Sequence, residues 1–318
     1  MKLLLLVQDE QRIILDRFYS EIARQCDDAK ILRLSSEDQS DLKKYFRENI
    51  DCNEYDRIVL FLRFKKEIKQ VEFLRMIPNL VFLEHDAYQN YIDSKYKGVF
   101  SKHYKKIPWV RVLTSGYGVS QKLQSEGVDA FFVPKCYDDA MIKNLNRARD
   151  IELGFIGSTK SKTYSKRKEF LEILEREEKL LITRTNSGNE YVDALNRIKF
   201  FISADVGMGE YMIKNFEAMA AGCVVFAWNQ GELENKALGF NDMENIVLYS
   251  SRKELKQKLS ELRQNEEKVK SIAQAGQQLA EQQYSYGTVA SKVHKALQSD
   301  LRQPRKKTIL FFSTYSYA

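Results

Sequence analysis

The chain has 318 residues, enough for about two domains of ordinary size. Lysine and arginine outnumber the acidic residues by 51 to 44, so the net charge is +7, and the hydrophobic fraction of 43% can fill a large core. This composition excludes disordered and collagen-like classes, and no apolar run approaches the roughly 18–20 residues of a membrane-spanning helix. We therefore expect a soluble, cytoplasmic α/β protein.

Cysteine and histidine are few and scattered. The cysteines are Cys26, Cys52, Cys136 and Cys223, with no C-x-x-C pair, and the chain has three histidines. No spacing among them is typical of a metal site. We predict reduced, mostly buried thiols and no metal ion.

Short apolar segments alternate with amphipathic stretches along the chain. Their lack of polar alternation predicts strands of parallel sheets covered by helices on both faces. Strands are expected at 2–7, 29–34, 56–61, 79–83, 109–114 and 130–133 and, after a linker at 139–150, at 151–158, 180–183, 199–203, 223–227 and 245–249. Helices are expected at 13–24, 167–177, 191–198 and 211–221, followed by two long polar helices to about residue 300. The pattern predicts two doubly wound units.

The last residues repeat the pattern with which the chain opens. Arg302, Arg305, Lys306 and Lys307 precede an apolar segment at 308–312 and then small polar residues. One interpretation is a lone terminal strand. The alternative is the first strand of a further α/β domain in a longer polypeptide.

The most informative segment runs from Gly207 to Phe226. A glycine-rich loop leads into a predicted helix, whose first N–H groups and dipole favour an anion. Lys214 would supply a cation for a phosphate, and Glu217, on the same face, would accept hydrogen bonds from sugar hydroxyls. The alternative is that Glu217 merely pairs with Lys214 on an exposed helix face.

This segment, centred on Phe-Glu-Ala-Met-Ala-Ala-Gly-Cys-Val-Val at 216–225, resembles the donor-binding segment of group 1 glycosyltransferases, most closely the spore-maturation-type branch. The Gly-Phe-Ile-Gly-Ser run at 154–158, followed by Arg167, is similar to the opening of that family's second domain. The resemblance implies the GT-B fold, in which two Rossmann-like, doubly wound domains face a central cleft and a C-terminal helix crosses back to the first domain.

The resemblance also implies the domain organisation. The expected parts are an acceptor domain at 1–145, a donor domain at 146–285, a returning helix at 286–300 and a basic tail at 301–318. By resemblance, the enzyme transfers a sugar from a nucleoside-diphosphate sugar to a glycan or lipid-linked acceptor hydroxyl, in bacterial surface polysaccharide or glycoconjugate assembly. No cofactor is implied beyond this donor substrate.

The resemblance carries over onto a set of donor-binding residues. These are Gly157, Ser158, Arg167, Arg184, Gly209, Tyr211, Met212, Lys214, Asn215 and Glu217. Many members have two glutamates separated by seven residues, whereas Glu210 and Glu217 are separated by six, so Glu217 carries over as the ribose-binding candidate and Glu210 does not. For the phosphates, the competing cations are Lys160, Lys162, Arg167, Arg184 and Lys214.

The run Glu84-His85-Asp86 closes a predicted strand of the first domain. An inverting transfer needs a general base on the acceptor side, and Asp86 or His85 is the candidate, whereas a retaining transfer needs none. One alternative is a turn in which Asp86 caps the next helix. Another is the metal-binding acidic motif of the other main glycosyltransferase fold, which the second half of the chain contradicts. We expect transfer without a metal, with protein cations neutralising the leaving group.

Residues 94–125 contain no acidic side chain. They carry Lys95, Lys97, Lys102, Lys105, Lys106, Arg111 and Lys122, with Tyr96, Phe100, Tyr104 and Trp109 interleaved. The simple interpretation is a solvated basic face. The functional one is a surface for an acidic glycan, a lipid-linked acceptor or an anionic membrane, with peripheral association at its inner face. No nucleic-acid reader motif is present, so we expect no nucleic acid.

Two other functions remain open. One is a nucleotide-sugar epimerase on the same fold, and the other is a non-catalytic basic binding module with a relic nucleotide site. The Gly-x-x-Gly-Ser turn at 154–158 is neither a dinucleotide fingerprint nor a P-loop, so nicotinamide cofactors and ATP are disfavoured.

Overall fold

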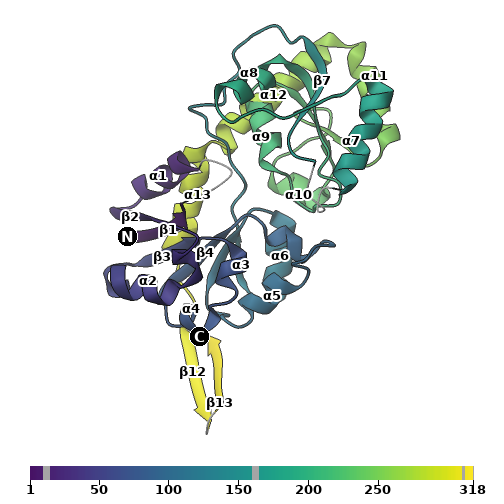
Figure 1. The fold of residues 1–318 in the computed structure, drawn as a ribbon. Helices are drawn as coiled ribbons and strands as arrows, with labels where there is room; N and C mark the ends of the chain where they lie inside the picture. Colours follow the sequence, from purple (N-terminus) through teal and green to yellow (C-terminus); the bar gives the residue numbers. More distant parts are fainter. Residues whose placement is uncertain (10–14, 160–164, 310–311, 318) are drawn as a thin grey trace. The chain divides into compact units, whose positions relative to one another are not determined.

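The computed structural model describes residues 1–9, 15–159, 165–309 and 312–317 and divides the chain into two compact units (Figure 1). Unit 1 comprises Met1–Val133 and Val289–Ala318, and unit 2 comprises Pro134–Thr288. The first division falls earlier than residue 145, so the segment expected as a linker belongs to unit 2.

Unit 1 is built on a six-stranded parallel sheet in the order β2-β1-β3-β4-β5-β6. Its strands are β1 (Lys2–Gln8), β2 (Asp28–Leu34), β3 (Arg57–Phe61), β4 (Leu80–Glu84), β5 (Arg111–Thr114) and β6 (Asp129–Phe132). Its helices are α1 (Asp16–Arg24), α2 (Leu42–Asn49), α3 (Phe64–Glu67), α4 (Val71–Leu74), α5 (Val99–Tyr104) and α6 (Tyr117–Ser125). The five residues Leu3–Val7 have no exposed surface, because an apolar strand inside such a sheet is covered on both faces.

Unit 2 carries a five-stranded parallel sheet in the order β11-β10-β9-β7-β8. Its strands are β7 (Ile151–Ile156), β8 (Leu181–Thr183), β9 (Ile198–Ser203), β10 (Val224–Trp228) and β11 (Val247–Tyr249). Its helices are α7 (Ser165–Glu178), α8 (Asn189–Arg197), α9 (Ile213–Ala220), α10 (Glu232–Ala237), α11 (Arg252–Arg263) and α12 (Glu266–Gln283), followed by α13 (Tyr286–Gln298), most of which lies in unit 1.

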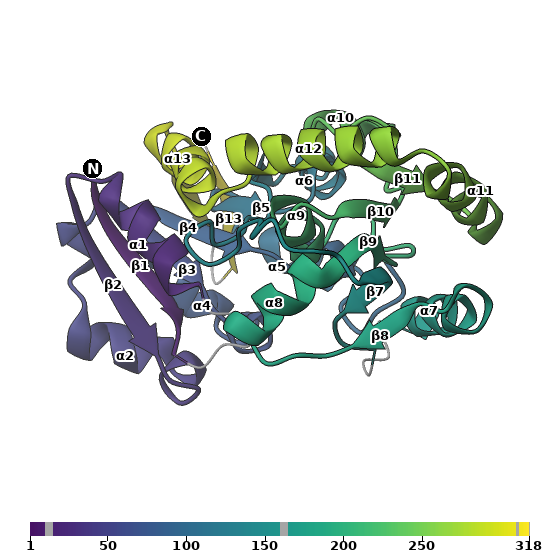
Figure 2. The ribbon, with the colours of Figure 1, turned by 90° about the horizontal axis from the view of Figure 1, so that it is seen from above.

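Helices cover both faces of the unit 2 sheet. Because crossovers between parallel strands are right-handed, α7 lies on one face while α8 and α9 lie on the other. Phe170 of α7 and Leu255 of α11 share one apolar core with Phe155, Phe200 and Phe226 of the sheet. Helix α12 lies beside α9 (Figure 2). The two doubly wound sheets confirm the predicted fold class.

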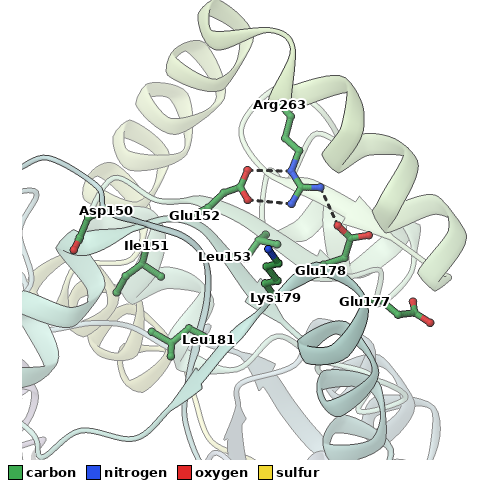
Figure 3. A pocket seen from close by; sticks show the side chains of 9 residues that line it. All are labelled: Asp150, Ile151, Glu152, Leu153, Glu177, Glu178, Lys179, Leu181 and Arg263. Atoms are coloured by element: carbon green, nitrogen blue, oxygen red, sulfur yellow. Dashed lines mark hydrogen bonds and ion pairs between the residues drawn. The ribbon is translucent and has the colours of Figure 1, made fainter.

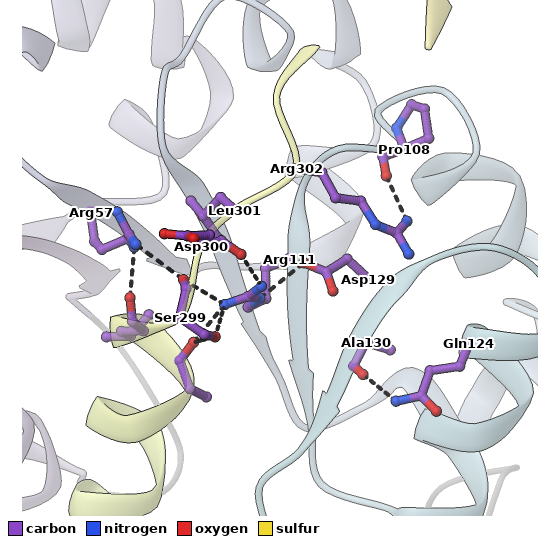
Figure 4. Close-up of polar contacts among 12 residues, drawn as sticks. Arg57, Pro108, Arg111, Gln124, Asp129, Ala130, Ser299, Asp300, Leu301 and Arg302 are labelled. Carbon is purple, nitrogen blue, oxygen red and sulfur yellow. Dashed lines mark hydrogen bonds and ion pairs between the residues drawn. The ribbon is translucent and has the colours of Figure 1, made fainter. Parts of the chain in front are cut away.

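The end of α13 is clamped to the sheet of unit 1 by two arginines (Figure 4). The buried Arg111 guanidinium pairs with Asp129 at 2.9 Å and donates to the carbonyl oxygens of Ala296 and Asp300, both at 2.7 Å. Arg57 donates to the carbonyl of Leu297 at 2.7 Å. These cations satisfy carbonyls that a helix end leaves without partners. Arg111 therefore belongs to a structural clamp and not to an exposed basic face, which corrects that part of the sequence-based expectation.

Three expected elements differ in the structure. Helix α9 begins at Ile213, later than expected, and three helices in place of two follow β11. The tail is not a lone strand, because β12 (Pro304–Ile309) pairs antiparallel with β13 (Phe312–Tyr317). Residues 310–311 of the predicted tail strand and 10–14 near the first predicted helix lie outside the described residues.

Candidate functional site

The topology of unit 2 marks one place on its sheet for a ligand. From β7 the chain moves outward to β8 and then returns to place β9 on the other side of β7. The loops after β7 and β9 therefore diverge, and ligands of open α/β sheets bind beyond the carboxyl ends of strands at such a point. These loops hold Gly157 and residues 204–212, which we call the donor loop.

Asp205 organises the donor loop. Its buried carboxylate pairs with the Arg167 guanidinium and accepts from the Ser203 hydroxyl at 3.0 Å. It also accepts from the Met212 N–H at 3.2 Å and the Asn215 side-chain amide at 3.0 Å. One buried charge thus ties α7 to the beginning of α9. Arg167, expected as a phosphate ligand, is committed to this ion pair.

Two glycines and one glutamine shape the rest of the loop. Gly207 and Gly209 have φ of 72° and 73°, a conformation that favours glycine. The Gln230 side chain accepts from the Gly209 N–H at 2.9 Å and donates to the Asp205 carbonyl at 2.8 Å. The loop is therefore fixed in the conformation that delivers the chain to α9.

Lys214, Glu217 and Tyr191 form a cluster at the beginning of α9. The Lys214 ammonium lies 4.1 Å from the centre of the Tyr191 ring and 3.9 Å from the Glu217 carboxylate. The Tyr191 hydroxyl donates to the same carboxylate oxygen. The pair that the alternative predicted is therefore present, but the Lys214 and Glu217 side chains are only 32% and 14% exposed, so it does not lie on a fully exposed helix face.

Electrostatics favours this cluster as an anion site. Burial lowers the pKa of the Lys214 ammonium, the Glu217 charge opposes this shift, and Arg167 adds to it. Burial also raises the pKa of the Tyr191 hydroxyl well above its usual value, with the Glu217 charge adding to the shift, so Tyr191 stays a donor. An ammonium whose charge is disfavoured by burial gains from a nearby phosphate.

The loop after β7 reaches this cluster. A Cβ added at Gly157 would lie 2.8 Å from the Phe155 ring, which disfavours any side chain there, and 3.5 Å from Cε of Lys214, which is ordinary contact. The Gly157 N–H donates to the Thr183 carbonyl at 3.0 Å, and the exposed Arg184 follows directly after β8. The structure thus brings Lys214, Glu217 and Gly157 together, with the half-buried Ser158 adjoining.

Other predicted residues lie deeper. The Tyr211 side chain is buried, and its hydroxyl bonds to Asn235, so it belongs to the core. Asn215 is fully buried, and its amide nitrogen donates to Asp205 and to the Met212 carbonyl at 2.9 Å. Met212 precedes α9 and offers its backbone to the loop. Lys160 and Lys162 lie outside the described residues.

Three residues of this region were missed by the sequence argument. Asp205 follows a buried strand at its carboxyl end, a position that could have indicated it. Tyr191 lies on α8, and no motif connects it with Glu217. Lys135 forms a buried ion pair with Glu210, which has no exposed surface.

The predicted acceptor residues lie in unit 1, after β4. The half-buried His85 packs edge-on against the Phe61 ring at 5.0 Å between centres. Asp86 is exposed, and its N–H donates to the Glu84 carboxylate at 2.6 Å. Asp86 occupies the N-cap position of the following short helix, as the capping alternative predicted, but its carboxylate makes no capping hydrogen bond there.

The basic segment of unit 1 divides between surface and core. Lys95, Lys97, Lys102 and Lys106 are exposed, whereas Phe100 is buried and its ring stacks on that of Phe64 at 3.6 Å between centres. Tyr104 and Trp109 are buried too. The interleaved aromatic residues are therefore largely core, and the lysines alone form the exposed basic face.

A cavity of about 600 Å³ opens at the amino edge of β7 and β8, away from the donor loop (Figure 3). Three of its charged residues pair with one another, since Arg263 donates to both oxygens of Glu152 at 3.0 Å and to Glu178 at 2.8 Å. Among the described residues no group of His, Cys, Asp or Glu could hold a metal ion, and no described helix combines the length and apolarity needed to cross a membrane.

Comparison with known proteins bears on the fold of the chain and on its family resemblance. Residues 139–295 match the model of the glycosyl transferase-like family. Among solved structures, HepE of Anabaena in complex with UDP-glucose is similar, with a TM-score of 0.67 and 14% identity over 93% of this chain and 99% of that one. Sucrose-phosphate synthase of Thermosynechococcus elongatus is similar with a TM-score of 0.63 and 9% identity over 92% and 97%.

A glycosyltransferase of Rickettsia africae ESF-5 is similar with a TM-score of 0.62 and 12% identity over 93% of this chain and 97% of that one. No curated protein sequence matches. The fold is therefore that of the GT-B glycosyltransferases, as predicted. The family match over residues 139–295 and this fold agree with the resemblance to group 1 glycosyltransferases that the sequence indicates.

Proposed function

We propose that the chain transfers a sugar from a nucleoside-diphosphate sugar to an acceptor hydroxyl. The observation that carries the proposal is the cluster of Lys214, Tyr191 and Glu217 beside the switch point of the unit 2 sheet. The similar HepE structure holds UDP-glucose, which supports a donor of this class.

The chemistry of the cluster suits such a donor. The N–H groups of Ile213 and Lys214 begin α9 and, with the Lys214 ammonium, would bind the diphosphate. The Glu217 carboxylate, held by Tyr191, would accept hydrogen bonds from ribose hydroxyls. As the glycosidic bond breaks, charge develops on the leaving diphosphate, and these fixed donors stabilise it. We propose that Lys214 and Arg184 supply the cations, without a metal.

We propose that the acceptor binds at unit 1. In an inverting reaction Asp86, which is exposed and uncommitted to a helix cap, or the neighbouring His85 would take the acceptor proton. A retaining reaction would need neither. Asp86→Asn is expected to abolish transfer and to leave nucleotide binding unchanged if the reaction inverts, and transfer at the wild-type rate would rule out Asp86.

We propose that the acceptor is a glycan or lipid-linked sugar of bacterial surface polysaccharide or glycoconjugate assembly, and that the protein works at the inner face of the membrane. The exposed lysines between residues 95 and 122 support an anionic surface as partner. Replacing Lys95, Lys97 and Lys102 with glutamine should weaken sedimentation with anionic vesicles and leave nucleotide binding intact.

Product analysis separates this function from its alternatives. The full chain is incubated with UDP-, GDP- and dTDP-sugars and a bacterial glycolipid extract, and the nucleotides are followed by NMR. Transfer releases a nucleoside diphosphate and depends on the extract. An epimerised nucleotide-sugar without release would indicate the epimerase, and binding without turnover would indicate the non-catalytic module.

A further inference from the structure

The chain passes between the two units twice, after Val133 and after Thr288. On the unit 2 side of these crossings the two segments, residues 135–137 and 284–286, are joined by a parallel β-bridge centred on Tyr137. The N–H of Tyr137 donates to one carbonyl of the second segment at 3.0 Å, and its carbonyl accepts from that segment at 3.1 Å. We call these two segments the crossing pair.

The crossing pair is attached to the donor site at two points. Lys135 of the first segment forms the buried ion pair with Glu210 of the donor loop. Tyr284 of the second segment packs its ring against Phe216, with 4.5 Å between the ring centres. Phe216 precedes Glu217 in α9, so both attachments lie beside the residues proposed to bind the nucleotide.

The desolvation cost of burying the Lys135–Glu210 ion pair offsets much of the attraction between its charges. The Lys135 side chain is 9% exposed and that of Glu210 is 1% exposed, so both charges have left water. Apolar residues of similar volume would stabilise unit 2 as well or better, whereas removing one charge alone would be strongly destabilising. A pair of this kind gains its value by fixing one arrangement of the groups that carry it.

We propose that Lys135 is a positioning residue that links the donor loop to the crossing pair. Nucleotide binding orders the loop through Lys214 and the N-terminus of α9, and the Lys135–Glu210 pair passes that ordering to the segments through which the chain enters and leaves unit 2. By reciprocity, the state of the crossing pair then sets the affinity of the loop for nucleotide. This inference rests on the proposed function, because it needs a ligand at the donor loop.

Hydrogen exchange of the full chain, with and without a nucleoside diphosphate that binds, tests the link. In the wild type the nucleotide should slow exchange at least threefold both in residues 204–212 and in the crossing pair. In Lys135→Met/Glu210→Met, which leaves no lone buried charge, it should slow exchange only in the loop. The single variant Lys135→Arg, which keeps the positive charge, should still show slower exchange in both the loop and the crossing pair.

The matched control is the exposed pair of Arg147 and Asp193, 56% and 52% exposed, replaced by methionine in the same way. This control variant should show the same nucleotide-dependent protection as the wild type. If the Lys135–Glu210 pair is only structural, the Lys135→Met/Glu210→Met variant should show that protection too. A wild type protected in the loop alone overturns the inference and leaves the proposed function standing, and this measurement holds even if the double variant fails to fold. A wild type that binds no nucleoside diphosphate overturns both.

Discussion

Glu217→Gln separates the ligand-binding role of Glu217 from its structural role. The glutamine carbonyl can still accept from the Tyr191 hydroxyl, so the free energy of unfolding should change little. For the ligand, two charge-assisted hydrogen bonds to ribose hydroxyls become neutral ones, a loss of about 1 kcal/mol each. The substitution also releases Lys214 from its ion pair with Glu217, which is long at 3.9 Å and partly exposed. This release offsets the loss of binding free energy by at most about 1 kcal/mol.

The net loss of about 1–2 kcal/mol corresponds to a five- to thirtyfold weaker dissociation constant. Isothermal titration of the nucleoside diphosphate that binds the wild type measures it, with the exposed Glu232→Gln as a control expected to match the wild type. A Glu217→Gln variant that binds within twofold of the wild type would refute the ribose assignment.

Three further changes test the site. Because burial lowers the pKa of Lys214, its ammonium loses its proton at lower pH than an exposed lysine does, so nucleotide affinity should fall as pH rises from 7 to 10. The affinity of Lys214→Met should not show this fall, and the same pH dependence in the wild type and the variant would contradict the role of Lys214. Asp205→Asn leaves the buried Arg167 without its carboxylate and should cost about 3–5 kcal/mol of unfolding free energy in urea, a loss below about 1 kcal/mol being inconsistent with the ion pair. Gly157→Ala places a methyl 2.8 Å from the Phe155 ring and should lower the free energy of unfolding in urea by about 1–3 kcal/mol, whereas an unchanged free energy of unfolding would contradict the close packing of this turn.

Local patterns were enough for the strands and for the glycine-rich loop before α9. Buried strands are apolar throughout and short, so β1, β7 and β10 are visible as runs of sequence, and the glycines before α9 mark a helix beginning. The family resemblance added the ribose candidate, and the structure places Glu217 where such a role is possible.

Pairings between distant residues could not be predicted in the same way. In the sequence, Arg167 is a basic residue near a glycine turn. Only the fold shows that its guanidinium forms an ion pair with Asp205. Tyr211 was a donor-binding candidate through the family resemblance, but α9 begins only at Ile213 and the Tyr211 ring is buried in the core. Tyr191 approaches Glu217 only because α8 and α9 share one face of the sheet.

Thermal unfolding of the full chain against UDP, GDP, dTDP, ADP and CMP tests the central claim most directly. A ligand at about 100 times its dissociation constant adds roughly 2.7 kcal/mol, which raises the Tm of a unit of this size by about 5 °C or more. The account predicts that one nucleoside diphosphate gives this shift and that Lys214→Met loses most of it. No shift with any nucleotide, or an equal shift in the variant, would contradict a donor site at α9.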